Sequence, residues 1–562
     1  MKRKLLFLLP GLAGFCCFYL VPFFFILYYS VVNDAFRQEF AGLQNYGRLL
    51  RNPAFLLGLK NSLLFLGMAA AATLLFSLLL AFLLQSVCPR SGVLHSVLLF
   101  PLTVPAAAIL LLVSVFFDFH GILNGLLTAL GIQPLSWLNG GLGRLTLLLL
   151  FLWKHCGLCS LLLLAALQTI PSEEREAAKL DGANGAQLFF RIELPHLAPS
   201  MLFIVLLSLL FGFRFFREIY RLEGRYPTRE LYSLQHFMHN VFEILDYQKL
   251  SAAAVLLFVF TALCMGVLAL LCRRLGADSV ICLPQSGQRE KPRIVGVVFT
   301  LLFSVLCLFP SVVTLLHSFA EEQDLQLHYS AVFDRRSLMD QPVRLLLLPD
   351  RLTLSGYRTL LDGHSAWKKQ LLNSVFLTVP ALLGQLFFAF SSAYGFSRLR
   401  GTLRNTLFFL YIVLLLMPYE VILLPNYLTA RFLGILDTRW AVWLPCWFSP
   451  LPVYLLAKQM ERVPAELREA AELDGAGEWT LLTRIYLPQL RGVLGMTVFF
   501  LFIDAWNMTE LPLTLLTSPA LQPFSVFLSD VQAGALSPSF AAAVLFSLPP
   551  LLLFFAAQKR GT

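Results

Sequence analysis

The sequence contains few charged residues. Asp, Glu, Lys and Arg make up 14% of its 562 residues, whereas 58% are apolar and the mean hydropathy is +0.73. An average soluble domain is about one quarter charged, because charged side chains cover its surface. The composition therefore excludes an ordinary soluble protein and predicts a polytopic membrane protein.

Motifs that would carry out chemistry are also missing. The sequence has no GxxxxGK[ST] loop to hold the phosphates of ATP. Its ten cysteines have no metal-type spacing, and Cys156 and Cys159 lie within an apolar run, where we expect packing and not redox chemistry. His155 and Cys156 are adjacent, so on a helix their side chains point in different directions. We expect no metal site, no resident cofactor and no enzyme active site in this chain.

Long apolar runs are what the sequence has instead. A helix of about 20 apolar residues crosses a bilayer, and these runs do not alternate as the strands of a membrane barrel do. Many contain proline, which a spanning helix tolerates when neighbouring helices satisfy its freed backbone groups. We therefore predict an all-α protein with about twelve transmembrane helices, six in each half: 5 to 32, 62 to 85, 95 to 117, 144 to 167, 199 to 216, 251 to 272, 293 to 319, 371 to 395, 405 to 430, 440 to 458, 492 to 511 and 540 to 557.

The net charge of +10 indicates orientation in the membrane. With the spans as placed, basic clusters at the two termini and in residues 273–293 fall on one side of the membrane. Positive charge marks the cytoplasmic side, so we expect cytoplasmic termini, contact with lipid and no nucleic-acid partner. Residues 273–293 also contain Gly and Pro, which predicts a cytoplasmic linker between a first half, 1–272, and a second half, 294–562.

One polar stretch occurs twice, and we call its copies window one (residues 170–195) and window two (residues 463–488). They agree at 15 of 26 positions with a constant offset of 293 residues, each between the fourth and fifth spans of its half. The dipeptide Asn-Ser also recurs at the start of the second span, as Asn61-Ser62 and Asn373-Ser374. The repeats indicate duplication of a six-span unit.

Each window predicts two short helices joined by a tight bend. Helix-forming residues with acidic side chains in the first turn follow a proline, which favours a first helix. Gly182 and Gly475 are expected to end it. Asp181 and Asp474 are expected to close that turn and to start a second helix that stops before Pro195 or Pro488. The alternative is a solvated amphipathic connector, and two copies at equivalent places favour a shared docking role.

The windows resemble a known loop. The string EAAxxDGAxxxxxxxxIxLP, present at 176–195 and 469–488, is similar to the cytoplasmic coupling loop of the membrane subunits of bacterial ABC importers. The resemblance implies two type I permease halves in a bacterial cytoplasmic membrane, two cytoplasmic ATPase subunits that bind ATP and magnesium and hydrolyse the ATP, and an extracellular or periplasmic solute-binding protein. It also implies these ATPase-docking residues: Glu176, Ala177, Ala178, Asp181, Gly182, Ala183, Glu469, Ala470, Ala471, Asp474, Gly475 and Ala476.

Other stretches resemble the carbohydrate subgroup of these permeases, whose two membrane subunits are usually separate chains. The first half has GLQNY at 42–46 and FRFFREIY at 213–220, and the second has LPDRLTLSGYRTLL at 348–361 and FIDAWNMTELPLTLL at 502–516. The resemblance implies a sugar importer whose two permeases are fused. We expect the substrate path to involve the last three spans of each half, with these candidates: Phe211, Arg214, Trp506 and Asn507. For Trp506 and Asn507, packing between helices is an equal alternative.

An ion-coupled secondary carrier with two six-helix repeats is the alternative class of function. Such a carrier uses acidic residues within the membrane, and Asp504 and Glu420 are the acidic residues placed suitably for that role. A carrier has no use for paired windows of this kind. The sequence does not specify the sugar, the identity of the ATPase, or whether the halves pair within one chain.

Overall fold

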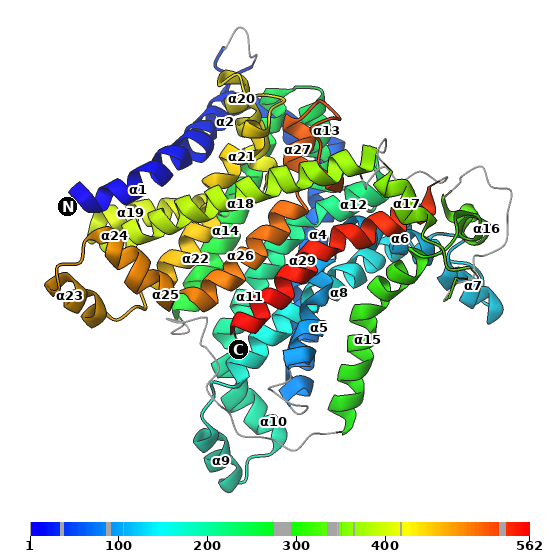
Figure 1. The fold of residues 1–562 in the computed structure, drawn as a ribbon, viewed down its shortest axis with the longest axis horizontal. Coiled ribbons are helices and arrows are strands. Elements are labelled where there is room, and N and C mark those ends of the chain that lie inside the picture. Colours follow the sequence, from blue (N-terminus) through cyan, green and yellow to red (C-terminus); the bar gives the residue numbers. More distant parts are fainter. Residues whose placement is uncertain are drawn as a thin grey trace.

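The computed structural model describes residues 2–33, 39–85, 92–104, 106–274, 294–333, 346, 348–349, 351–362, 366–415, 419–527 and 535–561. Within these ranges the regular secondary structure is helical. The β-type pairing there consists of two isolated bridges, Val32 with Phe40 and Ala320 with Leu352. The prediction of an all-α fold is confirmed. Figure 1 shows long helices running side by side through the body of the molecule.

The helices of the first half are α1 (Lys2–Phe15), the π-helical turn η1 (Cys16–Leu20), α2 (Val21–Ser30), α3 (Gln44–Leu50), α4 (Pro53–Gln85), α5 (Gly92–Thr103), α6 (Ala106–Phe117), α7 (Ile122–Ala129), α8 (Gly140–Leu167), α9 (Ser172–Leu180), α10 (Gly185–Leu188), the π-helical turn η2 (Phe189–Glu193), α11 (Leu194–Arg214), α12 (Phe216–Glu223), α13 (Leu234–Glu243) and α14 (Tyr247–Arg274).

The helices of the second half are α15 (Ile294–His317), α16 (Glu322–Phe333), α17 (Ser355–Leu361), α18 (Ala366–Arg398), α19 (Thr402–Leu415), α20 (Tyr419–Phe432), α21 (Arg439–Trp447), α22 (Pro450–Met460), α23 (Ala465–Leu473), α24 (Glu478–Thr480), the π-helical turn η3 (Leu481–Tyr486), α25 (Leu487–Gln489), α26 (Arg491–Trp506), α27 (Glu510–Leu515), α28 (Phe524–Phe527) and α29 (Leu536–Gly561).

Nine helical stretches within the described residues are long and apolar enough to cross a membrane. The other three predicted spans are built from shorter helices: 95 to 117 from α5 and α6, 405 to 430 from α19 and α20, and 492 to 511 from α26 and α27. Between these helices of the two third spans, Pro105 and residues 416–418 lie outside the described residues.

The first helix of each half packs on the other half. In α1, the Phe7 carbonyl accepts a 2.8 Å hydrogen bond from Ser391 of α18, and the Phe15 ring stacks on Tyr411 of α19 at 3.9 Å between centroids. In α15, the Leu306 carbonyl accepts a 3.0 Å hydrogen bond from the indole of Trp153 in α8. The two halves therefore pair within one chain, and Figure 1 shows α1 beside α18 and α15 beside α5 and α8.

Two helices flank the predicted linker between the halves. Helix α14 runs on to Arg274 and α15 begins at Ile294. Arg273 and Arg274 therefore belong to a helix of the first half, and the rest of the predicted linker, 275–293, lies outside the described residues.

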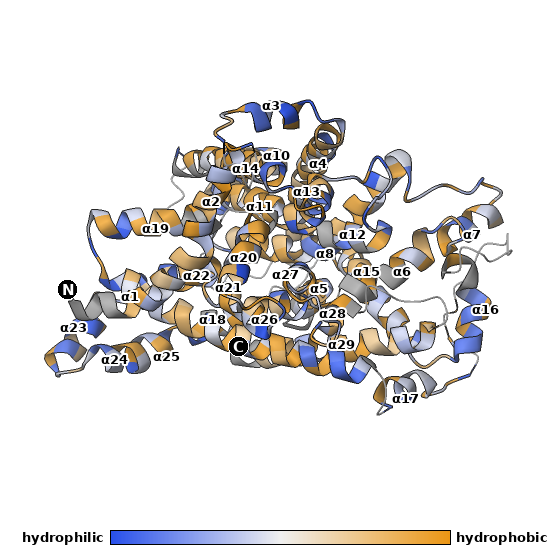
Figure 2. Cartoon of the chain, turned by 90° about the horizontal axis from the view of Figure 1, so that it is seen from above, coloured by the Kyte–Doolittle hydropathy of each residue, from blue (hydrophilic) through white to orange (hydrophobic). Residues whose placement is uncertain are grey.

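Large apolar side chains cover much of the outer surface of the long helices. Phe24, Leu75, Leu302 and Phe387 are all exposed, on α2, α4, α15 and α18. Figure 2 shows the long helices as mainly hydrophobic, with hydrophilic residues concentrated at peripheral helices such as α3, α16 and α23. An apolar belt of this size suits a lipid environment, because water would be a poor solvent for it.

Candidate functional site

Window one contains a helix ended by glycine. Helix α9 follows Pro171, and Gly182 adopts a φ of +80°, a left-handed conformation that favours glycine. Its N–H donates to the Lys179 carbonyl at 3.1 Å, and the next N–H, from Ala183, donates to Ala178 at 2.9 Å. This pair of bonds is a Schellman cap, which satisfies the last carbonyls of the helix.

Window two has the same geometry. Helix α23 follows Pro464, and Gly475 also has a φ of +80°. Its N–H donates to Glu472 at 3.1 Å, and that of Ala476 donates to Ala471 at 2.9 Å. The prediction of a first short helix ended by glycine is confirmed in both windows.

The second short helix departs from the prediction. It begins after Asn184 or Gly477, and Asn184 supplies the side-chain cap, so Asp181 and Asp474 close the first helix instead of starting the second. It also does not stop before the proline. The chain passes through a π-helical turn, η2 or η3, and the proline occupies the first turn of the following α-helix. Proline is tolerated there because a first-turn residue needs no helical donor.

The windows leave one face of each helix uncovered. Neither α9 nor α23 buries a residue, and Glu176, Ala177, Glu469 and Ala470 are exposed. Leu180 and Leu473, which follow the alanine pairs, are both 89% exposed. A leucine exposed to this degree beside small and acidic residues, at the same place in both halves, is suited to a protein partner.

Both windows project on one side of the molecule. In Figure 1, α9 and α10 lie at the bottom and α23 and α24 at the left. The start of α1 is also at the left, and the end of α29 lies near the lower centre, between the two windows. Helices α7, α16 and α17 lie on the opposite side. The fold thus brings the two sequence repeats to one face, at separate corners of it.

Different contacts hold the two windows to the helical body. In window one, Arg175 pairs with Glu193 at 3.3 Å and donates to the Leu167 carbonyl at 3.2 Å. In window two, the equivalent Arg468 instead pairs with Glu469 at 3.2 Å, a contact within α23 itself. The window-two side chain Glu478 accepts from Tyr394 of α18.

Arg398, at the end of α18, joins two acidic residues of window two. Its guanidinium pairs with Glu472 and lies 3.5 Å from Glu478, and its side chain is 5% exposed. Glu472 and Glu478 correspond to Lys179 and Gly185 in window one, so window one cannot make this contact. The second window is therefore attached to its half by a buried cation that the first one does not use.

We expect Arg398→Ala to loosen window two alone. A buried hydrogen-bonded ion pair is lost, so hydrogen exchange across residues 465–478 should rise while exchange across 172–188 stays unchanged. Arg398→Lys should restore part of the protection, because a lysine keeps the charge without the two-pronged geometry. Arg400→Ala, an exposed change two residues away, is the control. Equal exchange in both windows of the Arg398→Ala protein would contradict this attachment.

The fifth spans bring two charges together across the halves. Arg214, at the end of α11, donates to Asp504 of α26 at 3.1 Å, and the two side chains are 52% and 48% exposed. Arg214 was predicted as a substrate-path residue, and Asp504 was considered under the ion-coupled alternative. The pairing shows that the ends of the fifth spans face each other between the halves.

The other substrate-path candidates lie in packed surroundings. Trp506 is 3% exposed, donates its indole N–H to the Phe546 carbonyl at 2.9 Å and stacks on Phe502. Asn507 donates to the Ile503 carbonyl of its own helix at 3.1 Å. These contacts are those of packing between and within helices, and a substrate-path role for the two residues stays a prediction.

Phe211 also lies in packed surroundings. Its ring stacks on that of His155 at 4.4 Å between centroids, with 11° between the ring planes. Arg214 is placed at the junction between the halves. Trp506 also lies there, because its buried cluster includes Val104 and Ile109 of the first half.

The chain matches a protein family twice. The family is described as "Binding-protein-dependent transport system inner membrane component", and its two matches cover residues 74–277 and 385–560. The chain belongs to this family. Each match contains one of the two windows, so each half is one copy of the inner membrane component.

Curated relatives of this inner membrane component are about half its length. A trehalose/maltose transport system permease protein of Thermococcus litoralis is 29% identical, over 46% of this chain and 89% of its own length. A probable ABC transporter permease protein of Bacillus subtilis is 31% identical, over 45% and 90%. An arabinooligosaccharides transport system permease protein of the same species is 26% identical, over 49% and 95%. One relative corresponds to one half, as expected for two permeases fused in one chain.

A solved structure was also matched. The crystal structure of a bacterial ABC transporter involved in the import of alginate shares 23% sequence identity with this chain, at a TM-score of 0.42, over 48% of this chain and 96% of the matched chain.

Some structural residues of this inner membrane component were not singled out from the sequence. Arg398 and Tyr394 stand on an ordinary spanning helix, and nothing in one sequence marks them as contacts of window two. Arg144 and Arg439 contact the repeated asparagines Asn61 and Asn373. The Asn-Ser repeat points to these asparagines as a sign of duplication, but it does not indicate that the two arginines bind them.

Proposed function

We propose that this chain is the complete membrane pathway of an ATP-driven sugar importer. The observation that carries the proposal is the pair of windows, which repeat the same cap and the same exposed leucine on one face of the molecule. Family membership supports a solute-binding protein as partner, and the named relatives support a sugar as the transported solute.

In this proposal the chain binds two cytoplasmic ATPase subunits, one at each window. The docking surface comprises Glu176, Ala177, Ala178, Asp181, Gly182 and Ala183 in window one, and Glu469, Ala470, Ala471, Asp474, Gly475 and Ala476 in window two. Exposed alanines make a shallow face, and the glutamates can pair with cations of the partner. ATP and magnesium belong to the ATPase, and hydrolysis takes place there.

The alternating movement follows from where the contacts lie. On the side opposite the windows, Phe242 of α13 packs against Tyr427 of α20, with 5.6 Å between ring centroids, so the halves touch there. The windows lie apart in Figure 1. This arrangement suits an inward-open state, and drawing the windows together would separate the halves at their outer ends.

The orientation and division of the chain are part of the proposal. We place the windows and both termini in the cytoplasm of a bacterium, with residues 1–272 and 294–562 as the two permease halves. The outer loops then face the solute-binding protein.

We expect Glu469→Lys to abolish binding of the ATPase at window two. The side chain is 64% exposed, so charge reversal should leave folding and membrane insertion intact while it repels a cationic partner. Co-purification of the ATPase with the full chain measures binding, and the matched window-one change is Glu176→Lys. With both changes together, the ATPase should be lost completely.

Two outcomes would contradict the proposal. Undiminished capture of the ATPase by the double variant would show that the windows do not dock it. Uptake by the purified chain alone, driven by an ion gradient, would favour the secondary carrier. Asp504 pairs with Arg214, and the side chain of Glu420 lies outside those described.

Uptake of a panel of saccharides by vesicles that hold the chain, its ATPase and its binding protein would identify the sugar.

A further inference from the structure

The outer loop between α12 and α13 is tied to the second span of its own half. The amide of Asn61 in α4 donates to the carbonyls of Arg229 and Tyr232 at 2.8 and 2.9 Å. Its carbonyl accepts from Arg144 of α8 at 3.2 Å. Asn61 is 6% exposed, so a single buried amide links two helices and the loop.

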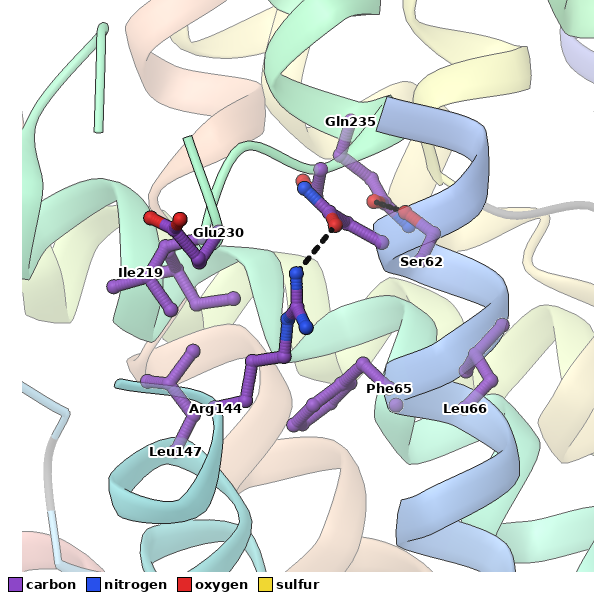
Figure 3. Close-up of a pocket in the computed structure, with 12 residues that line it drawn as sticks. Ser62, Phe65, Leu66, Arg144, Leu147, Ile219, Glu230 and Gln235 are labelled. Carbon is purple, nitrogen blue, oxygen red and sulfur yellow. Dashed lines mark hydrogen bonds between the residues drawn. The ribbon is translucent and has the colours of Figure 1, made fainter. Parts of the chain in front are cut away.

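The neighbouring residues tighten this link. Ser62 accepts from the backbone N–H of Leu234 at 2.9 Å and donates to Gln235 at 3.4 Å. A Cβ at Gly58 would lie 2.9 Å from the Ser233 carbonyl, so the loop backbone lies directly against α4. Figure 3 shows Arg144 reaching up from α8 toward α4, with Ser62 and Gln235 joined beside it.

The second half repeats the link with different loop residues. The amide of Asn373 in α18 donates to the carbonyls of Ala520 and Gln522 at 2.7 and 3.2 Å, and its carbonyl accepts from Arg439 of α21 at 3.0 Å. Ser374 accepts from the N–H of Phe524 at 2.8 Å. We call the sets Asn61-Ser62-Arg144 and Asn373-Ser374-Arg439 the two clamps.

The clamps hold loop segments that are exposed on the side opposite the windows. Arg229 and Ala520, whose carbonyls the asparagines bind, are exposed, as are their neighbours Tyr226 and Pro519. The first loop segment reads RYPTREL and the second TSPALQPF. The two loop segments differ in sequence, whereas the two clamps make the same kind of contacts. The feature that the two halves share is therefore the position of the loop backbone.

We propose that Asn61 and Asn373 are positioning residues for solute delivery, which hold each outer loop in the shape that accepts the solute-binding protein. The inference rests on the proposed function. The family description names a binding protein as the partner of this component, and the two unlike clamped loops present an asymmetric surface to a partner that binds across both halves. Because each clamp joins its loop to helices of the same half, each loop moves with that half when the halves separate.

Truncation of the clamps provides the test. Asn61→Ala should raise hydrogen exchange across residues 228–241 and leave 517–527 unchanged, and Asn373→Ala should do the reverse, because each buried amide serves one loop. In vesicles, each variant should raise the binding-protein concentration for half-maximal sugar uptake about five-fold, with the maximal rate within about two-fold of wild type. This split separates positioning from loss of the transport machinery.

Asn124→Ala is a matched control. Asn124 is fully buried, and its amide also donates to two loop carbonyls, Phe119 and Leu135, both at 2.8 Å. It belongs to a different outer loop, so its loss should loosen residues 119–135 without changing the binding-protein dependence. Asn61→Asp retains the acceptor for Arg144 but loses the donors, and it should behave like Asn61→Ala.

Several outcomes would overturn the proposal. An unchanged half-saturating concentration in both clamp variants, with exchange raised as expected, would show that the clamps only stabilise the fold. A change of the same size in Asn124→Ala would show that any loosened outer loop has this effect. If the wild-type chain takes up no saccharide, the proposed function fails, and the exchange measurement still decides whether the asparagines hold the loops.

Discussion

Gly475→Pro is expected to reduce sugar uptake to background while the protein remains in the membrane. Gly475 has a φ of +80° and its N–H donates to the Glu472 carbonyl. Proline has a φ near −65° and no N–H, so the substitution breaks both the bend and the cap of α23. A cost of about 3 kcal/mol at the docking helix corresponds to a loss of at least about a hundred-fold.

Gly477→Ala is the control for this variant. Gly477 lies two residues further along the same bend, has a φ of −73°, and a Cβ there would meet nothing within 4 Å. Alanine should therefore leave uptake close to that of the wild type. Uptake is measured as ATP-driven accumulation in vesicles, with the amount of inserted protein determined by blotting. Full uptake by Gly475→Pro would remove window two from the coupling pathway.

Arg214→Ala is expected to uncouple ATP hydrolysis from transport. The Arg214–Asp504 pair joins the fifth spans in the arrangement where the outer ends of the halves touch. Loss of the pair should favour separation of the halves, so that ATP hydrolysis without binding protein rises by up to about five-fold, the effect of roughly 1 kcal/mol for a half-exposed ion pair. The amount of sugar imported per ATP should fall accordingly.

Exchange of the two charges tests whether their attraction is the cause. The double variant Arg214→Asp with Asp504→Arg retains an ion pair at the same place and should return the unstimulated hydrolysis toward the wild-type rate. Asp504→Ala should resemble Arg214→Ala. If the exchanged protein is as uncoupled as the single variants, the positions matter for another reason, such as contact with the sugar.

The windows could be predicted from sequence because their geometry is local. A glycine three residues before the start of the second helix, preceded by a run of helix-forming residues, is sufficient to specify the cap at Gly182. The place where the second helix ends was predicted wrongly. A proline tends to end the helix that precedes it, but it is also tolerated in the first turn of the next helix. At Pro195 the second tendency prevails, because the π-helical turn η2 leads directly into α11.

Contacts between distant segments could not be predicted. Arg214 and Asp504 are 290 residues apart, and only the packing of the two halves brings them together. Trp506 and Asn507 show the converse. Their side-chain chemistry suits a sugar, but burial against Phe546 and a bond within the helix occupy them. A single sequence specifies what a side chain can bind, and the tertiary fold decides what it meets.

The π-helical turns near the ends of the two windows have a mechanical consequence. In the first half, helix is continuous from Gly185 to Arg214, through α10, η2 and α11, and so it joins window one to the level of Arg214. The stretch from Leu194 to Arg214 alone is about 30 Å long at about 1.5 Å per residue. In the second half the corresponding stretch is divided at Leu490, between α25 and α26. A displacement of window one is thus transmitted along one continuous helix. The helical connection from window two is interrupted at Leu490, close to the window.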